Sequence, residues 1–148
     1  ECLMSYVVDA NKKGVNVIDK NKQALLRSIE RVYESNREDE SDKALFLERP
    51  YSLTSNPDVL KAFATLAFKK AASIGAVLQH SFANERLIKT FDEMAAQQGW
   101  DIEENPARDI RFARSRNKFE YSDAFGGKLE FYGNKTSKTL VREYRLPV

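Results

Sequence analysis

Apolar residues spaced three and four apart between Asn56 and Gly75 predict a helix with one buried face. Asn56 is a favoured N-cap, and Pro57 fits the first helical position, where a missing N–H costs nothing. Asp58 adds negative charge at the positive end of the helix, and Gly75 is typical of a helix end. The predicted buried stripe, with Phe68 beside it, consists of Leu60, Phe63, Ala64, Ala67, Ala71 and Ile74.

A second helix is expected after the short apolar run 76–79, which predicts an interior strand. Ser81 can cap this helix, and Gly99 predicts its end. Residues 100–103 are then predicted to be the parallel neighbour of strand 76–79, reached by a right-handed crossover. The buried stripe of the second helix consists of Leu87, Ile88, Phe91, Met94, Ala95 and Gln98. Residues 56–104 therefore predict a helix-strand-helix-strand unit.

Before this unit, residues 5–36 predict a hairpin and a helix. The β-branched runs 5–10 and 15–19 flank a short connection that begins with Asn and ends with Gly, which favours a hairpin. Apolar spacing then predicts a helix over residues 21–36. Its stripe consists of Ala24, Leu25, Ile29, Val32 and Tyr33.

The charged run 35–43 contains no apolar residue, so it predicts a solvated loop. Residues 44–47 predict a short strand that ends ahead of Pro50, because the residue before proline avoids the helical region. Near the C-terminus, β-rich runs separated by glycine-containing turns predict an antiparallel meander over residues 108–146. These runs are 110–121, 128–132 and 139–146.

The pattern as a whole predicts a single domain, 1–148, of the α+β or α/β class, with a mixed sheet and about three helices. A chain of 148 residues with 42% hydrophobic and 31% charged residues is ordinary for one globular domain. No apolar run approaches the ~20 residues needed to cross a bilayer, so we expect no membrane partner. The single cysteine, Cys2, and the lack of signal-peptide features favour a reducing, cytoplasmic compartment. Either Met4 is the natural first residue and the residues before it are not native, or the chain is a piece of a larger protein, which we favour.

Charge is unevenly distributed along the chain. Residues 108–148 contain ten Lys and Arg against five Asp and Glu, a net charge of +5. Because the total is +2, the remaining residues carry a net −3. A basic segment of this kind indicates an anionic partner.

Basic and aromatic residues alternate within this segment, which suits contact with nucleic acid. Guanidinium and ammonium groups neutralise phosphates, and exposed rings offer stacking platforms to unpaired bases. Two alternatives stay open: the rings are core and the basic residues are a solvated outer face, or the patch binds an acidic protein. The candidate nucleic-acid-binding residues are Arg111, Arg114, Arg116, Lys118, Phe119, Tyr121, Tyr132, Arg142 and Arg145.

Candidate catalytic groups are few. His80 is the only histidine, so this chain cannot supply a multi-histidine metal site or a histidine pair for acid-base chemistry. It lies between a predicted strand end and a helix start, where His80, Ser81 and Asn84 form a possible polar or anion site. The alternative is a histidine that only satisfies local hydrogen bonds.

The acidic residues at the end of this unit suggest a second, weaker possibility. Asp101, Glu103 and Glu104 could hold a divalent cation, since alternate residues of a strand share a face. No acid and lysine pair of the kind a metal nuclease needs accompanies them, and the alternative is that they are solvated carboxylates at a strand end. We therefore predict no catalytic residue, no metal and no cofactor, and we lean towards a non-enzyme.

Three stretches of the central unit together resemble a small α/β domain attached to plasmid relaxases and phage polyvalent proteins. They are residues 58–67, 76–81 and 91–100 (FDEMAAQQGW), about a third of the chain. The resemblance implies a non-catalytic accessory module in a DNA-processing or DNA-transfer protein, such as one used in conjugation, with a docking or secretion-recognition role.

Two functional hypotheses follow. The first is a nucleic-acid-associated accessory module that binds DNA or RNA. The alternative is a protein-protein interaction module, in which the acidic run 38–42 and the basic meander contact different partners.

Overall fold

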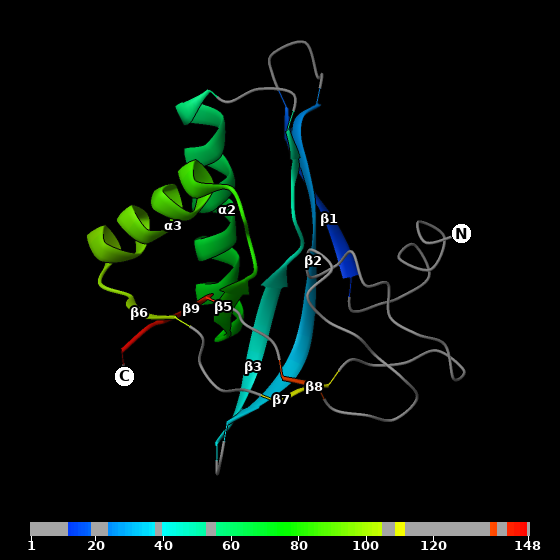
Figure 1. Ribbon diagram of the computed structural model, residues 1–148, viewed down its shortest axis with the longest axis vertical. Coiled ribbons are helices and arrows are strands. Elements are labelled where there is room, and N and C mark those ends of the chain that lie inside the picture. The colour runs from blue at the N-terminus through cyan, green and yellow to red at the C-terminus, as the bar shows by residue number, and fades with distance from the viewer. Residues whose placement is uncertain are drawn as a thin grey trace.

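The computed structural model describes residues 12–18, 24–37, 40–52, 56–104, 109–111, 137–138 and 142–147 of the chain. Two helices lie on one face of a mixed sheet (Figure 1). The elements are β1 (Lys12–Ile18), β2 (Ala24–Arg37), β3 (Glu40–Leu47), β4 (Tyr51–Ser52), α2 (Pro57–Ile74), β5 (Val77–His80), α3 (Glu85–Gln98), β6 (Asp101–Glu104), β7 (Asp109–Arg111), β8 (Ser137–Lys138) and β9 (Arg142–Arg145).

The described strands pair in the order β6-β9-β5-β3-β2-β7-β8, with β1 and β4 also paired to β2. β3 and β5 are parallel and are joined through α2, whereas the other pairs are antiparallel. The predicted mixed sheet in an α/β arrangement is therefore confirmed. Two helices are present in the described part of the chain, against about three predicted.

The helix predicted after Asn56 is confirmed as α2. The Asn56 side chain accepts a hydrogen bond from the Asp58 N–H at 2.9 Å, and Gly75 ends the helix in the left-handed region with φ of 67°. A residue with a Cβ is strained at such a φ, so glycine fits this position. The cap, proline and glycine signals were sufficient to predict α2, because they agree with the way this helix packs on the sheet.

The predicted cap of the second helix is wrong. Asn84, rather than Ser81, caps α3, and its Oδ1 accepts a hydrogen bond from the Leu87 N–H at 3.1 Å. Phe82 is buried and stacks on His80 with ring centroids 4.0 Å apart. Residues 81–84 are non-helical, and this connection places Phe82 in the core. Gly99 ends α3, as predicted.

The helix predicted over residues 21–36 is also wrong, because residues 24–37 form the long strand β2. Leu26 and Ser28 are both buried, at the two-residue spacing of a strand. Pairing with β1 on one side and β3 on the other outweighs the apparent helical spacing.

The charged run 35–43 is not a free loop, since its two ends belong to β2 and β3. In the strand register, position 34 lies opposite Lys43 and position 37 lies opposite position 40. The strand predicted over 44–47 is confirmed as the end of β3.

The predicted N-terminal hairpin is correct only in part. β1 includes residues 15–18, but it also contains residues 12–14, which were expected to form the turn. β1 pairs with β2, the strand that stands where a helix was predicted. The other predicted arm, 5–10, lies outside the described residues.

Two predictions about strand neighbours are overturned. β6 is parallel in direction to β5, but β9 lies between them and is antiparallel to both. The C-terminal strand therefore joins the central unit, while β7 and β8 pair with each other at the far edge. The last strand of the predicted meander therefore pairs elsewhere in the sheet. Residues 112–136 lie outside the described part of the chain.

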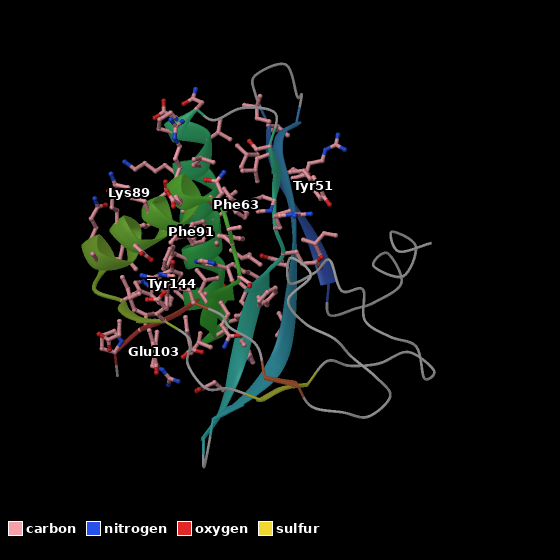
Figure 2. All side chains as sticks on the ribbon, viewed as in Figure 1. Tyr51, Phe63, Lys89, Phe91, Glu103 and Tyr144 are labelled. Carbon is pink, nitrogen blue, oxygen red and sulfur yellow. The ribbon has the colours of Figure 1, made fainter. Side chains whose placement is uncertain are left out.

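The core lies between the helices and the sheet and is rich in aromatic rings. Phe63 and Phe91 meet edge to face at 5.6 Å, and Phe68 packs against Trp100 at 5.1 Å and Tyr144 at 5.2 Å. Figure 2 shows Phe63 and Phe91 in this layer. Tyr144 comes from the last strand, so β9 contributes directly to the core.

Candidate functional site

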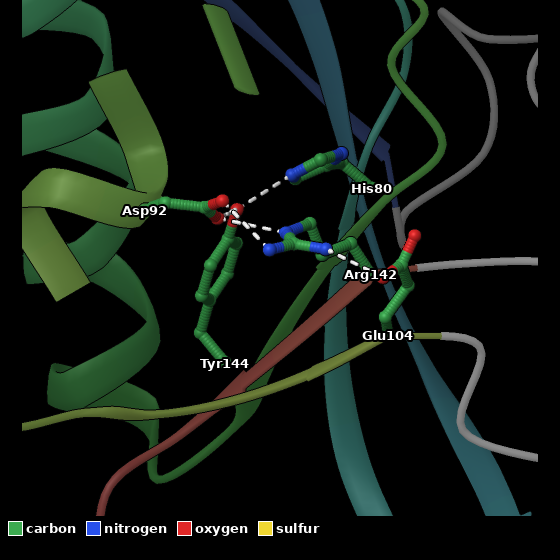
Figure 3. A network of polar contacts seen from close by, with 5 residues as sticks. All are labelled: His80, Asp92, Glu104, Arg142 and Tyr144. Atoms are coloured by element: carbon green, nitrogen blue, oxygen red, sulfur yellow. Dashed lines mark hydrogen bonds and ion pairs between the residues drawn. The ribbon is translucent and has the colours of Figure 1, made fainter. Parts of the chain in front are cut away.

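The candidate site is a polar network on the helix-facing side of β9 (Figure 3). Arg142 and Tyr144 alternate along β9 and so share one face, on which His80 of β5 lies opposite Arg142. Asp92 of α3 lies above them. The network connects β5, β9 and α3, three elements that are far apart in the sequence.

The hydrogen bonds of the network have a defined direction. Tyr144 Oη donates to Asp92 Oδ1 at 2.8 Å, so its proton is not available to His80. His80 Nε2, also 2.8 Å from Tyr144 Oη, is therefore the donor in that contact. His80 Nδ1 accepts from the Phe82 N–H at 3.1 Å, which requires its lone pair. The geometry selects a neutral imidazole with the proton on Nε2.

Arg142 completes the network with a two-point contact to Asp92. Its Nε lies 2.8 Å from Asp92 Oδ1 and its NH2 nitrogen lies 2.7 Å from Asp92 Oδ2. A second carboxylate, Glu104 on β6, lies 3.7 Å from the other terminal nitrogen. Such planar, bidentate pairing is the strongest geometry open to an arginine and a carboxylate.

Two pKa values respond to this arrangement. Burial raises the pKa of Tyr144 well above its usual range, and the hydrogen bond and negative charge of Asp92 raise it further. The hydrogen bond to Asp92 also raises the pKa of Arg142, which stays fully charged. Tyr144 is thus a permanent hydrogen-bond donor and is unsuited to act as a base near neutral pH.

A second polar cluster lies on the opposite face of the same strands. Gln79 Nε2 donates to Glu143 Oε1 at 2.6 Å, and both side chains are buried. Arg145 reaches from β9 to Asp42 on β3, with NH2 and Oδ2 2.6 Å apart, and passes within 3.8 Å of Glu143. β9 is therefore held by ionic contacts on both faces.

The structure places the predicted nucleic-acid-binding residues in different settings. Arg142 and Arg145 are held by Asp92 and Asp42 within the fold. The backbone of Arg111 forms the end of β7. The remaining candidates, Arg114, Arg116, Lys118, Phe119, Tyr121 and Tyr132, lie outside the described residues.

The residues of the predicted polar site around His80 have different surroundings. His80 is only 1% exposed, and its two ring nitrogens contact Tyr144 and the Phe82 N–H. Asn84 already accepts the Leu87 N–H, one of the helix donors that an anion would need. These contacts match the alternative in which the histidine satisfies local hydrogen bonds. Ser81 lies in the connection between them.

Asp101 and Glu103 both lie on β6, as the metal hypothesis required. Within the part of the chain that the structure describes, no three His, Cys, Asp or Glu side chains come close enough together to hold a metal ion.

The sequence reasoning passed over a cationic and aromatic surface on β2 and β4. Tyr51 is 65% exposed, and the guanidinium carbon of Arg49 lies over its ring, 5.9 Å from the ring centre. Arg27 lies opposite Tyr51 in the antiparallel pairing and is also exposed. The only sequence signal was Arg49-Pro50-Tyr51, a basic residue and a ring on either side of a rigid proline.

Comparison of the chain with protein-family models, with curated proteins and with solved structures found no match in any of the three. Neither of the helices in the described ranges is long and apolar enough to cross a membrane.

Proposed function

We propose that this chain is a nucleic-acid-associated accessory module of a larger DNA-processing or DNA-transfer protein. The observation that supports the proposal is the separation of charge, with net +5 in residues 108–148 and net −3 in the rest. A concentrated basic segment attracts a polyanion and releases its condensed counterions on binding.

Two of the candidate basic residues are less suited to phosphate contact than the others. Arg142 and Arg145 are each in a two-point contact with a carboxylate, and a phosphate would have to displace that partner. The proposal therefore assigns phosphate contact mainly to basic residues between positions 108 and 141. That stretch has eight Lys and Arg and four Asp and Glu, which gives 8 − 4 = +4.

The test is fluorescence anisotropy of labelled single-stranded and duplex DNA and RNA, titrated with the protein at two salt concentrations. Micromolar or tighter binding that weakens steeply with salt is expected. The double variant Arg114→Ala/Arg116→Ala should bind more weakly and with a smaller salt dependence. The matched control is Lys61→Ala/Lys69→Ala, which removes the same charge from exposed positions on α2. Lack of binding at low salt, or an equal loss in both double variants, would reject the proposal.

A protein-interaction module is the second candidate, and one observation favours it. β6 lies at one end of the described sheet, and Ile102 on this strand is 39% exposed. Leu146, 43% exposed, follows the neighbouring strand β9. A sheet edge with exposed apolar side chains can accept a further strand from a partner. A photo-crosslinking residue at position 102 should then capture a partner that the same residue at the exposed position of Leu66, on α2, does not.

A further inference from the structure

We infer that Tyr51, Arg49 and Arg27 form a platform for single-stranded nucleic acid, with a base stacked on the tyrosine ring and phosphates held by the arginines. The inference rests on the proposed function, and it names both the type of strand and a contact site in a part of the chain that the charge distribution did not indicate.

The exposure of Tyr51 needs an explanation. Aromatic side chains carry a large apolar surface and are usually well buried. Tyr51 is 65% exposed, the highest value among the large hydrophobic side chains in the described ranges. Figure 2 shows it on the side of the sheet away from α2 and α3, so it makes no contribution to the aromatic core.

The chain segment that carries Tyr51 is anchored to β2 on both sides of this residue. The Glu48 N–H donates to the Ile29 carbonyl at 2.9 Å, and Ser28 Oγ donates to the Glu48 carbonyl at 2.8 Å. On the other side, Ser52 Oγ donates to the Leu25 carbonyl at 3.4 Å. All three contacts tie this segment to β2. Because the backbone on both sides of Tyr51 is anchored, little ordering of this segment is needed when a ligand stacks on the ring.

Two arginines neighbour Tyr51 in the structure. The Arg49 guanidinium lies over it in a cation-π contact, and Arg27 occupies the position directly opposite on β2. Side chains opposite each other in an antiparallel pair lie about 5 Å apart at their Cβ atoms. Asn16 on β1 extends the same row beyond Arg27 and is also exposed. These four residues include two cations and one ring.

This chemistry matches a single strand better than a duplex. The faces of bases inside a duplex are covered by their neighbours, whereas an unpaired base can stack on a protein ring. Guanidinium groups beside the ring can then contact the adjoining phosphates or stack on a base themselves. A protein partner would also use tyrosine and arginine, but two neighbouring arginines beside one exposed ring favour a polyanion.

The experiment compares a labelled single-stranded oligonucleotide with a duplex of the same sequence, using the whole chain. Tyr51→Ala should weaken single-strand binding about 5- to 150-fold and leave duplex binding unchanged. Tyr51→Phe keeps the ring and should bind like the wild type. Arg27→Ala and Arg49→Ala should each lower the slope of log affinity against log salt by about 0.7. Leu66→Ala, at an exposed position on the helix layer, is the matched control and should have no effect.

The outcomes separate this inference from the proposed function. If the wild type binds single strands and Tyr51→Ala binds equally well, the platform is rejected and the proposed function stands. The stacking assignment is also rejected if Tyr51→Ala weakens duplex binding to the same degree, or if Tyr51→Phe behaves like Tyr51→Ala. If the wild type binds neither strand type, both ideas are rejected, and a protein partner for Tyr51 becomes the alternative. Thermal unfolding of each variant checks that the fold is unchanged.

Discussion

Tyr144 donates a 2.8 Å hydrogen bond to Asp92, although the two residues are 52 positions apart in the sequence. The contact fastens β9, the last strand of the described chain, to α3. β9 also lies between β5 and β6, so it links these two strands to each other and to the helix layer. The hydroxyl of one buried tyrosine therefore joins the C-terminal end of the chain to its central unit.

Replacement of Tyr144 by Phe should lower the free energy of unfolding by about 1–3 kcal/mol. The change removes the donor to Asp92 and the acceptor of the His80 Nε2–H while it keeps the ring in the core. Urea denaturation measures the effect. Tyr51→Phe is the matched control, because it removes a hydroxyl from an exposed ring and should change stability by less than about 0.5 kcal/mol. Equal stability of both variants would contradict a role for the buried hydroxyl.

Alkaline pH should weaken the fold through the same residue. The pKa of Tyr144 is raised in the folded state, while in the unfolded chain it returns to its usual value of about 10. The unfolded chain therefore binds fewer protons above that pH, and the stability contributed by Tyr144 declines as pH rises further. The loss approaches ~1.4 kcal/mol per pH unit for this group.

The measurement is the difference in unfolding free energy between the wild type and Tyr144→Phe, taken from pH 8 to about 11. The other tyrosines contribute equally to both proteins and cancel. The difference should be constant up to about pH 9 and then shrink. A constant difference at about pH 11 would contradict the raised pKa.

The Arg142–Asp92 pair should depend on the shape of the guanidinium as well as on its charge. Arg142→Lys keeps the positive charge but cannot make the two parallel contacts, so it should lower the free energy of unfolding by about 1–3 kcal/mol. The control is the exposed pair Lys89–Glu93 on α3, 3.8 Å apart. Lys89→Ala should cost no more than about 0.5 kcal/mol. Denaturation at low and high salt separates the two cases, since screening should affect only the exposed pair.

The sequence predicted those elements whose signals are local. α2 has an N-cap, a proline, an acidic first turn and a C-terminal glycine within one short stretch, and each agrees with its packing. β2 carries apolar residues that satisfy helical spacing and strand spacing at once. Its pairing with β1 and β3 decides between them, and that pairing is not visible in residues 21–36 alone.

The sequence singled out two residues of the candidate site, His80 and Arg142, but not the contacts that they make. His80 stood out because it is the only histidine and because it ends a predicted strand. Its partner Tyr144 lies 64 residues further along the chain, and the insertion of β9 between β5 and β6 brings them together. No local pattern indicates this insertion. Arg142 and Arg145 were assigned to phosphate for the same reason, because the carboxylates that hold them come from α3 and β3.

The two helix-ending glycines should be intolerant of a side chain to a similar degree. Gly75 has φ of 67° and Gly99 has φ of 77°, and a Cβ built on either meets no atom within 4 Å. The cost of Gly75→Ala and of Gly99→Ala is therefore purely that of the left-handed backbone, about 1–2 kcal/mol each. Ser73→Ala, at an exposed position on α2, is the control and should be neutral or slightly stabilising because alanine favours the helix.

Urea denaturation of the three variants measures these differences. Because no steric contact is involved, the two glycine variants should lose similar stability, and their losses should add in the double variant, since the glycines end different helices. A glycine variant as stable as the Ser73→Ala control would show that the turn can leave the left-handed region without loss of packing. That result would contradict the assignment of the glycine to a strained cap.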